Sequence, residues 1–562
     1  MKRSLFILSV LISVLFSKAQ SPSFQWVQDL GGTSEDTCFA NAVDLSGNIY
    51  STGTFSGTAD FDPGPGVYTL TSTGGSDIFV SKIDASGNFI WAVQIGGASG
   101  NEVAYAIDVD VSGNIFLTGY FASTADFDPG PGTFTIVPKG GMDIFACKLN
   151  SSGNFVWAKQ MSGYTNESGR GIDVDATGNV HLTGWFQGTA TDFDPGPGTY
   201  TLSSGGPSHN IFVCKLDASG NFVWAGTMGG WSYDQGWGIA VDNTGNVYTT
   251  GYFYYTIDLD PGPASYTIGN SPGYYAFISK LDVNGNFVWG NAFLGSSQVF
   301  SNAIALDASG NVYTAGTFHG TVDFDPGAGT YNLSTGGGFT NIFVSKLDPS
   351  GNFVWAFQKG STACSSCNNA VNDIAVDGSG IYVTGHFNGA TDFGTGFLYS
   401  ASGSFDVFAA KYDFLTNPIW TAQVTTTGDD RGFSIATDVT GYVYVAGMFS
   451  GPWCDFDPGP GTYTISTKGG EDAFEWKLNG GNVGINEIHG DKSIFNLYPN
   501  PNDGVFMIEL KTKEEITITN ILGQEVFRES FIEGKNKIDL HNLSHGVYMV
   551  RSKDKSQKIV ID

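Results

Sequence analysis

One unit of ~65 residues recurs seven times along this chain, a period typical of repeat architectures. The most visible segment of each copy is an acidic loop that reads Asp-Phe-Asp-Pro-Gly-Pro-Gly from Asp60. Related loops start at Asp126, Asp192, Asp258, Asp323, Asp392 and Asp455. A unit of this size is one supersecondary block that buries its faces only against neighbouring copies. The period therefore predicts a repeat fold before any local propensity is considered.

Each unit is predicted to contain four strands. In the second copy, runs rich in β-branched and aromatic residues lie at 106–110, 115–121, 143–149 and 155–158. Turns of the form Asp-x-Ser/Thr-Gly-Asn separate the first two strands and, with Asn or Asp in first place, the last two. In such turns the Asp side chain accepts backbone hydrogen bonds and the Gly adopts a positive φ.

The two ends of the array predict how it closes. A tryptophan recurs in the fourth strand at positions 91, 157, 224, 289, 355 and 420, and Trp26 precedes the first complete unit. The last unit ends after its third strand, 472–478. We therefore expect segment 24–28 to supply the missing strand. The predicted fold class is all-β, a seven-bladed β-propeller closed by its N-terminal strand, which leaves no open sheet edge.

Two segments, 106–120 and 303–316, read AIDVDVSGNIFLTGY and AIALDASGNVYTAG. They resemble the bacterial seven-bladed β-propeller (SBBP) repeat, and the resemblance recurs in register over residues 24–479. It implies a fold and no particular activity, because function belongs to sites placed on a fold.

The N-terminus has the pattern of a signal peptide over residues 1–19. Lys2 and Arg3 precede an apolar run from Leu5 to Phe16, and small residues follow before Gln20. The run is too short to span a bilayer, and no other apolar stretch approaches the ~20 residues that a membrane helix needs. We expect a propeller domain over 20–480 and no transmembrane segment in the mature chain.

After a Gly- and Asn-rich linker, 481–492, the repeat is absent. The segment 495–506 reads FNLYPNPNDGVF and resembles the opening of the type A C-terminal sorting domain of the type IX secretion system. Segments 518–526, 543–550 and 558–562 match its later motifs in order. The resemblance implies a small β-sandwich at 493–562 that the outer-membrane translocon recognises. It also implies a protein that passes through the periplasm and is secreted or held on the outer surface of a Gram-negative bacterium.

The chain is strongly acidic, with 54 Asp or Glu, 26 Lys or Arg and a formal net charge of −28. Residues 21–492 hold 44 of the acidic residues and 14 of the basic ones, a balance of −30. Nucleic acid is not an expected partner, because phosphate binding needs clustered Lys and Arg. Cations or cationic surfaces match this charge better.

The acidic loops present paired carboxylates that suit Ca²⁺. Two Asp residues two positions apart share one face of an extended segment, and oxygen ligands of this kind bind calcium. The alternative is that these carboxylates only accept hydrogen bonds inside a rigid turn. The sixth loop, from Asp392, lacks the second Asp. The candidate metal ligands are Asp60, Asp62, Asp126, Asp128, Asp192, Asp194, Asp258, Asp260, Asp323, Asp325, Asp455 and Asp457.

One face of the predicted propeller is the better candidate for binding. The Gly-Asn turns all lie on one face, so the acidic loops and the connections between units share the opposite, more varied face. In the fourth unit this face is rich in aromatic residues, which predict either a sugar-stacking platform or packing under long loops. These residues are Trp231, Tyr233, Tyr254, Tyr255 and Tyr274.

No catalytic motif is visible, and we expect the chain not to be an enzyme. It contains no nucleophile elbow, zinc signature or phosphate loop. His181 and His386 fill positions that other units give to aromatic residues, whereas His209 and His319 are expected in loops without a partner. A glycosidase pair among the many Asp residues stays open, because carboxylate separation is invisible in sequence.

The expected function is that of a surface or secreted binding and adhesion module for a glycan or a protein, with a structural surface or matrix protein as the alternative. Six cysteines are few for a secreted chain of 562 residues. Cys147 and Cys214 are predicted to fill the core. Cys364 and Cys367 are predicted to form a local loop disulfide.

Overall fold

The computed structural model describes residues 22–269, 271–336, 339–361, 367–400, 403–481, 496–498, 504–510, 512–520, 525–541, 543, 546–552 and 555–561. The chain divides into two compact units, Met1–Asn482 and Val483–Asp562. All regular elements in the described ranges are strands, which confirms the all-β class. The predicted signal peptide and residues 482–492 of the predicted linker lie outside these ranges. Within them, no helix has the length and hydrophobicity that a membrane crossing requires.

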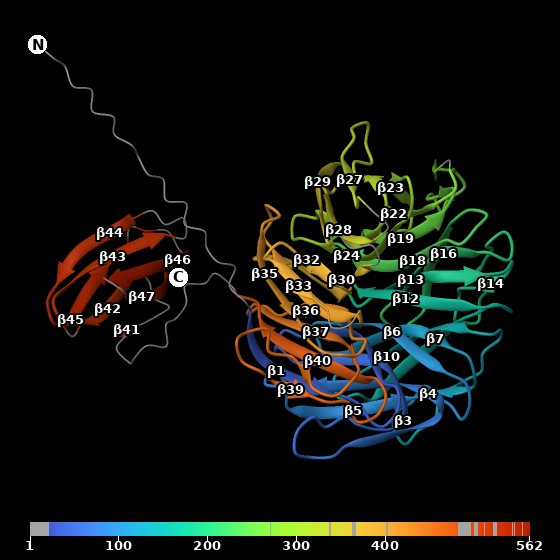
Figure 1. The fold of residues 1–562 in the computed structure, drawn as a ribbon, viewed down its shortest axis with the longest axis horizontal. Coiled ribbons are helices and arrows are strands. Elements are labelled where there is room, and N and C mark those ends of the chain that lie inside the picture. The colour runs from blue at the N-terminus through green and yellow to red at the C-terminus, as the bar shows by residue number, and fades with distance from the viewer. Residues whose placement is uncertain are drawn as a thin grey trace, which may run out of the picture. The chain divides into compact units, whose positions relative to one another are not determined.

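Seven antiparallel sheets form the first unit, and each contains four strands in chain order (Figure 1). Sheets 1 to 4 consist of β2 (Thr37–Val43), β3 (Ile49–Asp60), β4 (Thr69–Ile83), β5 (Phe89–Ile95); β6 (Glu102–Val109), β7 (Ile115–Phe121), β10 (Asp143–Leu149), β11 (Phe155–Met161); β12 (Glu167–Val174), β13 (Val180–Gln187), β16 (His209–Leu216), β17 (Phe222–Met228); and β18 (Gln235–Val241), β19 (Val247–Tyr254), β22 (Tyr274–Leu281), β23 (Phe287–Gly295).

Sheets 5 to 7 repeat the order, except that the N-terminal strand β1 is the fourth strand of sheet 7. They consist of β24 (Val299–Leu306), β25 (Val312–Phe318), β28 (Asn341–Leu347), β29 (Phe353–Lys359); β30 (Asn369–Asp377), β31 (Gly380–Phe387), β34 (Asp406–Tyr412), β35 (Pro418–Gln423); and β36 (Arg431–Thr437), β37 (Tyr442–Phe449), β40 (Asp472–Asn479), β1 (Ser23–Asp29).

The acidic loops are the tips of short hairpins between the second and third strands of each sheet. In sheet 1 the hairpin continues β3 and β4, and in sheet 4 the next hairpin extends the sheet to six strands through pairing of β23 with β26. The hairpin that extends sheet 4 is β26 (Thr321–Asp323) with β27 (Asn332–Ser334). The separate hairpins are β8 (Ala125–Asp126) with β9 (Thr135–Ile136), β14 (Thr191–Asp192) with β15 (Thr201–Leu202), β20 (Ile257–Asp258) with β21 (Thr267–Ile268), β32 (Ala390–Asp392) with β33 (Phe397–Tyr399), and β38 (Cys454–Asp455) with β39 (Thr464–Ile465).

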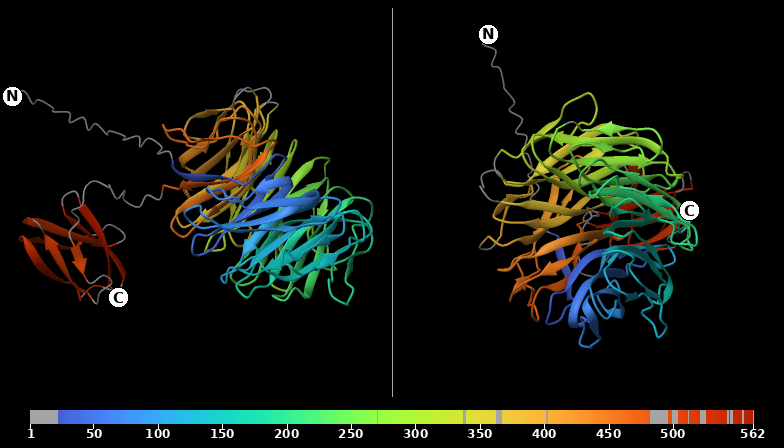
Figure 2. Two further views of the ribbon diagram at one scale, coloured as in Figure 1. Left: turned by 90° about the horizontal axis from the view of Figure 1, so that it is seen from below. Right: turned by 90° about the vertical axis from the view of Figure 1, so that its right-hand side faces the viewer.

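The seven sheets follow one another in a closed ring. The first strand of each sheet contacts the first strand of the next, and the last of these strands, β36, contacts β2. The blue strands that begin the unit and the orange strands that end it lie side by side in all three views (Figures 1 and 2). Hydrophobic clusters join residues of neighbouring sheets, so the core is distributed round the ring.

The N-terminal strand closes sheet 7, as predicted. β1 pairs antiparallel with β40, with Trp26 opposite Lys477 and Val27 opposite Trp476. β1 also contacts sheet 1 through a side chain: Gln28 Nε2 donates to the Gly87 carbonyl at 2.9 Å. Since the edge of β40 is paired, the ring presents no open edge at the junction of the chain ends.

The Gly-Asn turns have the predicted chemistry. In the first of them, Asp44 Oδ1 accepts from the backbone N–H groups of Ser46 and Asn48, both at 2.9 Å. Gly47 adopts a φ of 78°, a conformation that a Cβ atom disfavours. The same bonds recur at Asp84, Asp110, Asp175, Asp217, Asp242, Asp282, Asp307, Asp348 and Asp438.

The cysteines behave as core and loop residues. Cys147 and Cys214 are buried free thiols in β10 and β16, which confirms their predicted packing role. Cys367 is disulfide-bonded. Its predicted partner, Cys364, lies outside the described residues.

The second unit contains two antiparallel sheets that share one hydrophobic core. Its buried residues include Phe506, Ile518 and Val550, which come from both sheets. The sheets are β41 (Asn496–Tyr498), β42 (Val505–Leu510), β45 (Gly534–Asp539), and β44 (Glu525–Phe531), β43 (Glu514–Asn520), β46 (Gly546–Ser552), β47 (Lys555–Ile561).

Candidate functional site

The paired aspartates of the acidic loops accept hydrogen bonds from their own loop. In the first copy, Asp60 Oδ1 accepts from the N–H groups of Asp62 at 3.1 Å and Tyr68 at 2.8 Å. Asp62 Oδ1 accepts from the Gly64 N–H at 2.9 Å. Phe61, between the two carboxylates, is fully buried. These are the contacts expected if the carboxylates accept hydrogen bonds inside a rigid turn. At least one oxygen of each carboxylate already accepts such a bond.

The other complete loops repeat this arrangement. The first Asp accepts the same two backbone bonds, and the second Asp accepts one, at Asp126 and Asp128, Asp192 and Asp194, Asp258 and Asp260, Asp323 and Asp325, and Asp455 and Asp457. Among the described residues, no group of three or more His, Cys, Asp or Glu is arranged to hold a metal ion. Calcium binding at these loops stays a prediction.

The loops also join neighbouring sheets. Gly96, in the connection between sheets 1 and 2, forms a backbone bridge with Asp126, and Gly229 forms the same bridge with Asp258. The connections and the acidic loops therefore meet on one face, as the predicted topology requires. A repeated bridge of this kind gives the loops a structural role.

The five predicted aromatic ligand-binding residues differ in their ring contacts, and ligand binding by them stays a prediction. Tyr254 and Tyr274 pack edge to face with ring centroids 5.1 Å apart, and Tyr274 also packs against Phe300. Tyr233 packs against His209, whose ring stacks on Trp185 at 4.0 Å. The ring contacts recorded for the described residues include neither Trp231 nor Tyr255.

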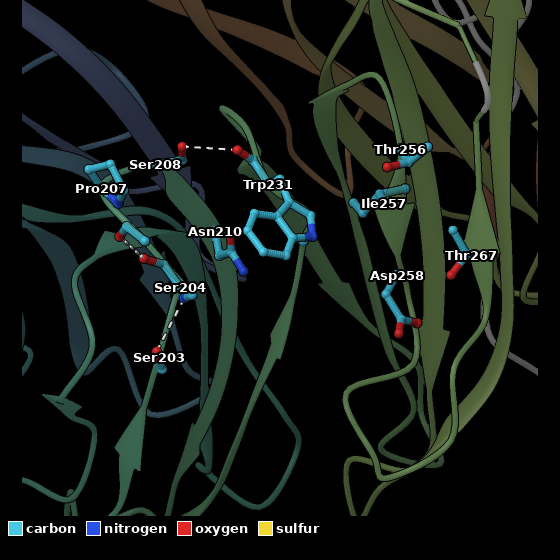
Figure 3. Close-up of a pocket in the computed structure, with 14 residues that line it drawn as sticks. Ser203, Ser204, Pro207, Ser208, Asn210, Trp231, Thr256, Ile257, Asp258 and Thr267 are labelled. Carbon is cyan, nitrogen blue, oxygen red and sulfur yellow. Dashed lines mark hydrogen bonds between the residues drawn. The ribbon is translucent and has the colours of Figure 1, made fainter.

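Trp231 differs from the others because 94% of its surface is exposed. Its indole ring lies between Asn210 and the hairpin segment Thr256–Asp258 (Figure 3). A hollow of ≈ 520 Å³ adjoins it. Hydroxyl, amide and carboxylate side chains line this hollow, namely Ser203, Ser204, Ser208, Asn210, Thr256, Asp258 and Thr267.

A second cavity, of ≈ 460 Å³, is lined by the first strands of all seven sheets. It is therefore at the centre of the ring, and we call it the central cavity. Each of these strands has a β-bulge, where the register with the second strand shifts by one residue. The residues at the bulge are Phe39, Tyr105, Arg170, Trp237, Asn302, Asn372 and Phe433, and all seven line the central cavity.

A glycine on each second strand makes the bulge sterically feasible. A Cβ atom on Gly119 would collide with the Val103 carbonyl oxygen of the bulged strand. The six equivalent glycines face a bulged strand in the same way, at Gly53, Gly184, Gly251, Gly316, Gly385 and Gly447. Because a bulge redirects the side chain of its extra residue, this local geometry aims seven side chains into one space.

The bulge residues were not among the predicted site residues. The glycines and small residues around them repeat, whereas the bulge position itself holds Phe, Tyr, Arg, Trp or Asn. Aligning the units would have exposed this one variable position inside an otherwise repeated strand. What the sequence did not show is the bulge, which turns these side chains toward the centre.

Several carboxyl groups have raised pKa values, but they serve the connections between sheets. Burial raises the pKa of Asp234 to about 7 and that of Asp430 to about 8. Asp234 accepts from the N–H of Gly230 at 2.6 Å, and Asp430 from that of Ser450 at 2.8 Å. Acids occupy the same position at Asp36, Glu102 and Glu167, and burial raises the pKa of all three. A position repeated in five units indicates a structural role.

His319 lies in a loop, as expected, but the loop placement of His209 was wrong, and both histidines have side-chain partners. His209 begins β16, and its Nδ1 lies 3.1 Å from Gln235 Nε2. His319 Nδ1 lies 2.9 Å from Ser297 Oγ. Both partners are distant in sequence, so only the folded ring brings them together. His181 is buried and His386 is half-buried, and desolvation lowers the pKa of each to about 4, which keeps both neutral at pH 7.

Residues 496–562 match the family of secretion system C-terminal sorting domains. Among curated proteins, an uncharacterized WD repeat-containing protein of Acanthamoeba polyphaga mimivirus is 24% identical over 513 residues, which cover 76% of this chain and 36% of that protein. The regulatory protein FlaEY of Caulobacter vibrioides is 26% identical over 148 residues, covering 26% of this chain and 15% of its own length. The chain thus spans well under half of either relative.

Similar solved structures include the WD40 domain of Neurospora crassa Pan2, with a TM-score of 0.31, 12% identity, and coverage of 67% of this chain and 89% of that one. PorZ, a surface component of the type IX secretion system of Porphyromonas gingivalis, gives a TM-score of 0.16 at 10% identity, covering 95% of this chain and 99% of its own. Through residues 496–562, this chain carries a C-terminal sorting domain of the type IX secretion system, which marks it as a secreted or outer-surface protein.

Proposed function

We propose that this protein is an exported, non-enzymatic binding module: a seven-bladed β-propeller of SBBP-type repeats delivered by the type IX secretion system. The ring of seven sheets closed by β1 supports the propeller assignment. The two sheets of residues 496–561 with their common core support a β-sandwich as the sorting domain. The proposed partner of that domain is the outer-membrane translocon.

The single observation that carries the binding role is the exposed Trp231 ring beside its polar hollow. An indole face supplies a large apolar contact at little entropic cost, and surrounding hydroxyl and amide groups fix orientation. Sugars present apolar ring faces together with hydroxyl groups, so a glycan is the ligand class that this hollow fits. Among the described residues that line the hollow, one, Asp258, has a carboxylate.

A glycan array probed with the mature full-length protein tests this role. We expect selective binding of a subset of glycans that is lost when Trp231→Ala removes the indole ring. Tyr331→Ala is a matched control, because Tyr331 is an exposed aromatic residue of the acidic loop before β27 that does not line the hollow. No selective binding, or equal binding by Trp231→Ala, would contradict the proposal.

A structural surface or matrix protein is the second candidate. The near-identical hydrogen bonding of six acidic hairpins favours it, because such a surface is repetitive from one sheet to the next. An array without any bound glycan, together with normal surface delivery, would support this second role.

Export is tested separately by deleting residues 493–562. We expect the truncated protein to remain in the periplasm with an unchanged melting transition of the first unit, because that unit has its own core. Cell fractionation decides the outcome, and normal delivery to the surface or medium would contradict the role of the sorting domain.

A further inference from the structure

The distribution of arginine in the acidic first unit is unusual. Residues 21–492 contain only two arginines, Arg170 and Arg431, and both line the central cavity. Arg170 belongs to sheet 3 and Arg431 to sheet 7, which are three sheets apart by the shorter way round the ring. The two guanidinium groups therefore approach the central cavity from well-separated directions.

Neither guanidinium group forms a close ion pair among the described residues, although Glu471 is near enough to Arg431 for a weaker electrostatic interaction. The ion pairs found among the described residues include neither arginine. The Nε–H of Arg170 and the Nε–H of Arg431 are buried without an acceptor in the described part of the chain. A buried donor without a partner costs about 1–3 kcal/mol, so each calls for an acceptor that the chain does not supply.

Aromatic rings hold the two arginines in place. The Arg170 guanidinium carbon lies 3.9 Å from the Tyr105 ring centroid and 4.9 Å from that of Trp237. The Arg431 guanidinium carbon lies 5.3 Å from the Phe405 ring centroid. Such contacts occupy the flat faces of a guanidinium group. Its N–H edges, which bind carboxylates in a two-pronged manner, stay available.

The aromatic rings form a continuous row between the arginines. The Phe39 ring centroid lies 5.3 Å from that of Phe433 and 5.2 Å from that of Tyr105. Phe433 shares its strand with Arg431, and Tyr105 contacts Arg170. The wall of the cavity from sheet 7 to sheet 3 thus runs from a cation across three rings to a second cation.

The other titratable groups that line the cavity leave it with excess positive charge. The Asp373 carboxylate already accepts from the N–H groups of Ile374 and Ile435, both at 2.8 Å, and from Ser434 Oγ at 3.0 Å. His386 is neutral at pH 7, because burial and the nearby Arg431 lower its pKa to about 4. Two guanidinium groups therefore face one carboxylate, inside a domain whose balance is −30.

We propose that the central cavity binds an acidic sugar. The guanidinium edges bind the sugar carboxylate and neighbouring hydroxyl oxygens. The row of rings packs against the apolar face of the sugar, and the Asn302 and Asn372 amides bind further hydroxyl groups. The volume of ≈ 460 Å³ lies within the range of about 300–1,000 Å³ that small-molecule sites occupy.

Isothermal titration calorimetry of the mature full-length protein tests this site. The probes are D-glucuronate, D-galacturonate and N-acetylneuraminate, with D-glucose and sodium sulfate for comparison. We expect at least one carboxylated sugar to bind, and D-glucose and sulfate to bind at least ~10-fold more weakly, because neither combines a carboxylate with a ring face. Failure of all three acids to bind, or sulfate binding as tightly as the best acid, would overturn the acidic-sugar assignment.

Variants locate the binding. Arg170→Gln and Arg431→Gln are each expected to lower the affinity for the tightest-binding carboxylated sugar at least ~10-fold, because a charged hydrogen-bond donor is lost. Lys139→Gln removes the same charge outside the cavity and should leave the affinity unchanged, as should Trp231→Ala, which separates this site from the hollow beside Trp231.

Folding is checked by thermal melts of every variant. If Arg170→Gln does not fold, Arg431→Gln decides the question, because among the described residues Arg431 packs on one ring, that of Phe405. Unchanged affinity in the folded arginine variants would overturn the proposal.

Discussion

The acidic loops and the bulge residues differ in how they repeat. Six loops keep the same pattern of carboxylates and the same backbone hydrogen bonds, whereas the bulge position holds Phe, Tyr, Arg, Trp or Asn in different sheets. The loops are conspicuous in the sequence and bind to their own backbone. The bulge residues are inconspicuous and meet in one cavity.

This difference separates scaffold from site. A position with the same residue in every unit serves what all units have in common, namely folding and packing against neighbouring units. A position that varies inside a fixed backbone is free to serve a ligand. Changes at repeated positions should therefore affect stability, and changes at the bulge should affect binding.

The largest loss of stability is expected from deleting residues 20–30. The deletion removes β1 and exposes the edge of β40, which promotes association of chains through unpaired strands. Thermal melts and light scattering should show a lower melting temperature and aggregation at protein concentrations where the full mature chain stays monodisperse. Unchanged behaviour would mean that the ring does not depend on its N-terminal strand.

A repeated glycine provides the next test. Gly119→Ala places a Cβ against the Val103 carbonyl oxygen, so the bulge must distort, and we expect a loss of ~3 kcal/mol in the free energy of unfolding. Gly378→Ala is the matched control, because a Cβ there has no heavy atom within 4 Å and no positive φ is required. Denaturant titration measures both, and equal losses would argue against a steric need for glycine at the bulge.

Stability should also depend on pH. The folded-state pKa values of Glu167, Asp234 and Asp430 are raised to about 7, about 7 and about 8, above the ~4 expected in the unfolded chain. The folded state then binds more protons than the unfolded state, so this stabilisation is complete below pH ~4 and is lost as pH rises to about 8. We expect a melting temperature several degrees higher at pH 5 than at pH 8.

Below pH 4 the turn aspartates reverse this trend. Hydrogen bonds lower the pKa of Asp242 to about 2, so its contribution is lost as pH falls through that value. Stability should therefore be greatest near pH 5. A melting temperature that rises steadily from pH 5 to pH 8 would contradict the assignment of these acids to buried connections.

The smallest expected effect is that of Ca²⁺ on the melting temperature, if the acidic loops are turns and not metal sites. We expect the melting temperature in Ca²⁺ to equal that in Mg²⁺ at matched ionic strength, because both then act only by screening the acidic surface. A rise specific to Ca²⁺ that the double variant Asp60→Asn, Asp62→Asn diminishes would instead establish the loops as metal sites.

The sequence predicted the strand pattern and the closing strand because both follow from periodic positions, such as the fourth-strand tryptophans and Trp26. The Gly-Asn turns were equally predictable, since their hydrogen bonds lie within five residues. The central cavity was not predictable from the sequence. It depends on a one-residue shift in register at Tyr105 and its equivalents, and on folding that brings Arg170 and Arg431 to the same cavity from distant parts of the chain. The contacts of the aromatic residues in the fourth unit were not predictable either, since Tyr233 packs on His209 of β16.

The most direct test compares a bulge variant with a loop variant in two assays. Arg170→Gln should lose acidic-sugar binding in calorimetry and keep its melting temperature to within a degree or two. Asp126→Ala should keep that binding and lower the free energy of unfolding by about 1–3 kcal/mol, because two backbone donors lose their acceptor. Loss of binding in Asp126→Ala, with binding retained in Arg170→Gln, would contradict the separation of scaffold from site.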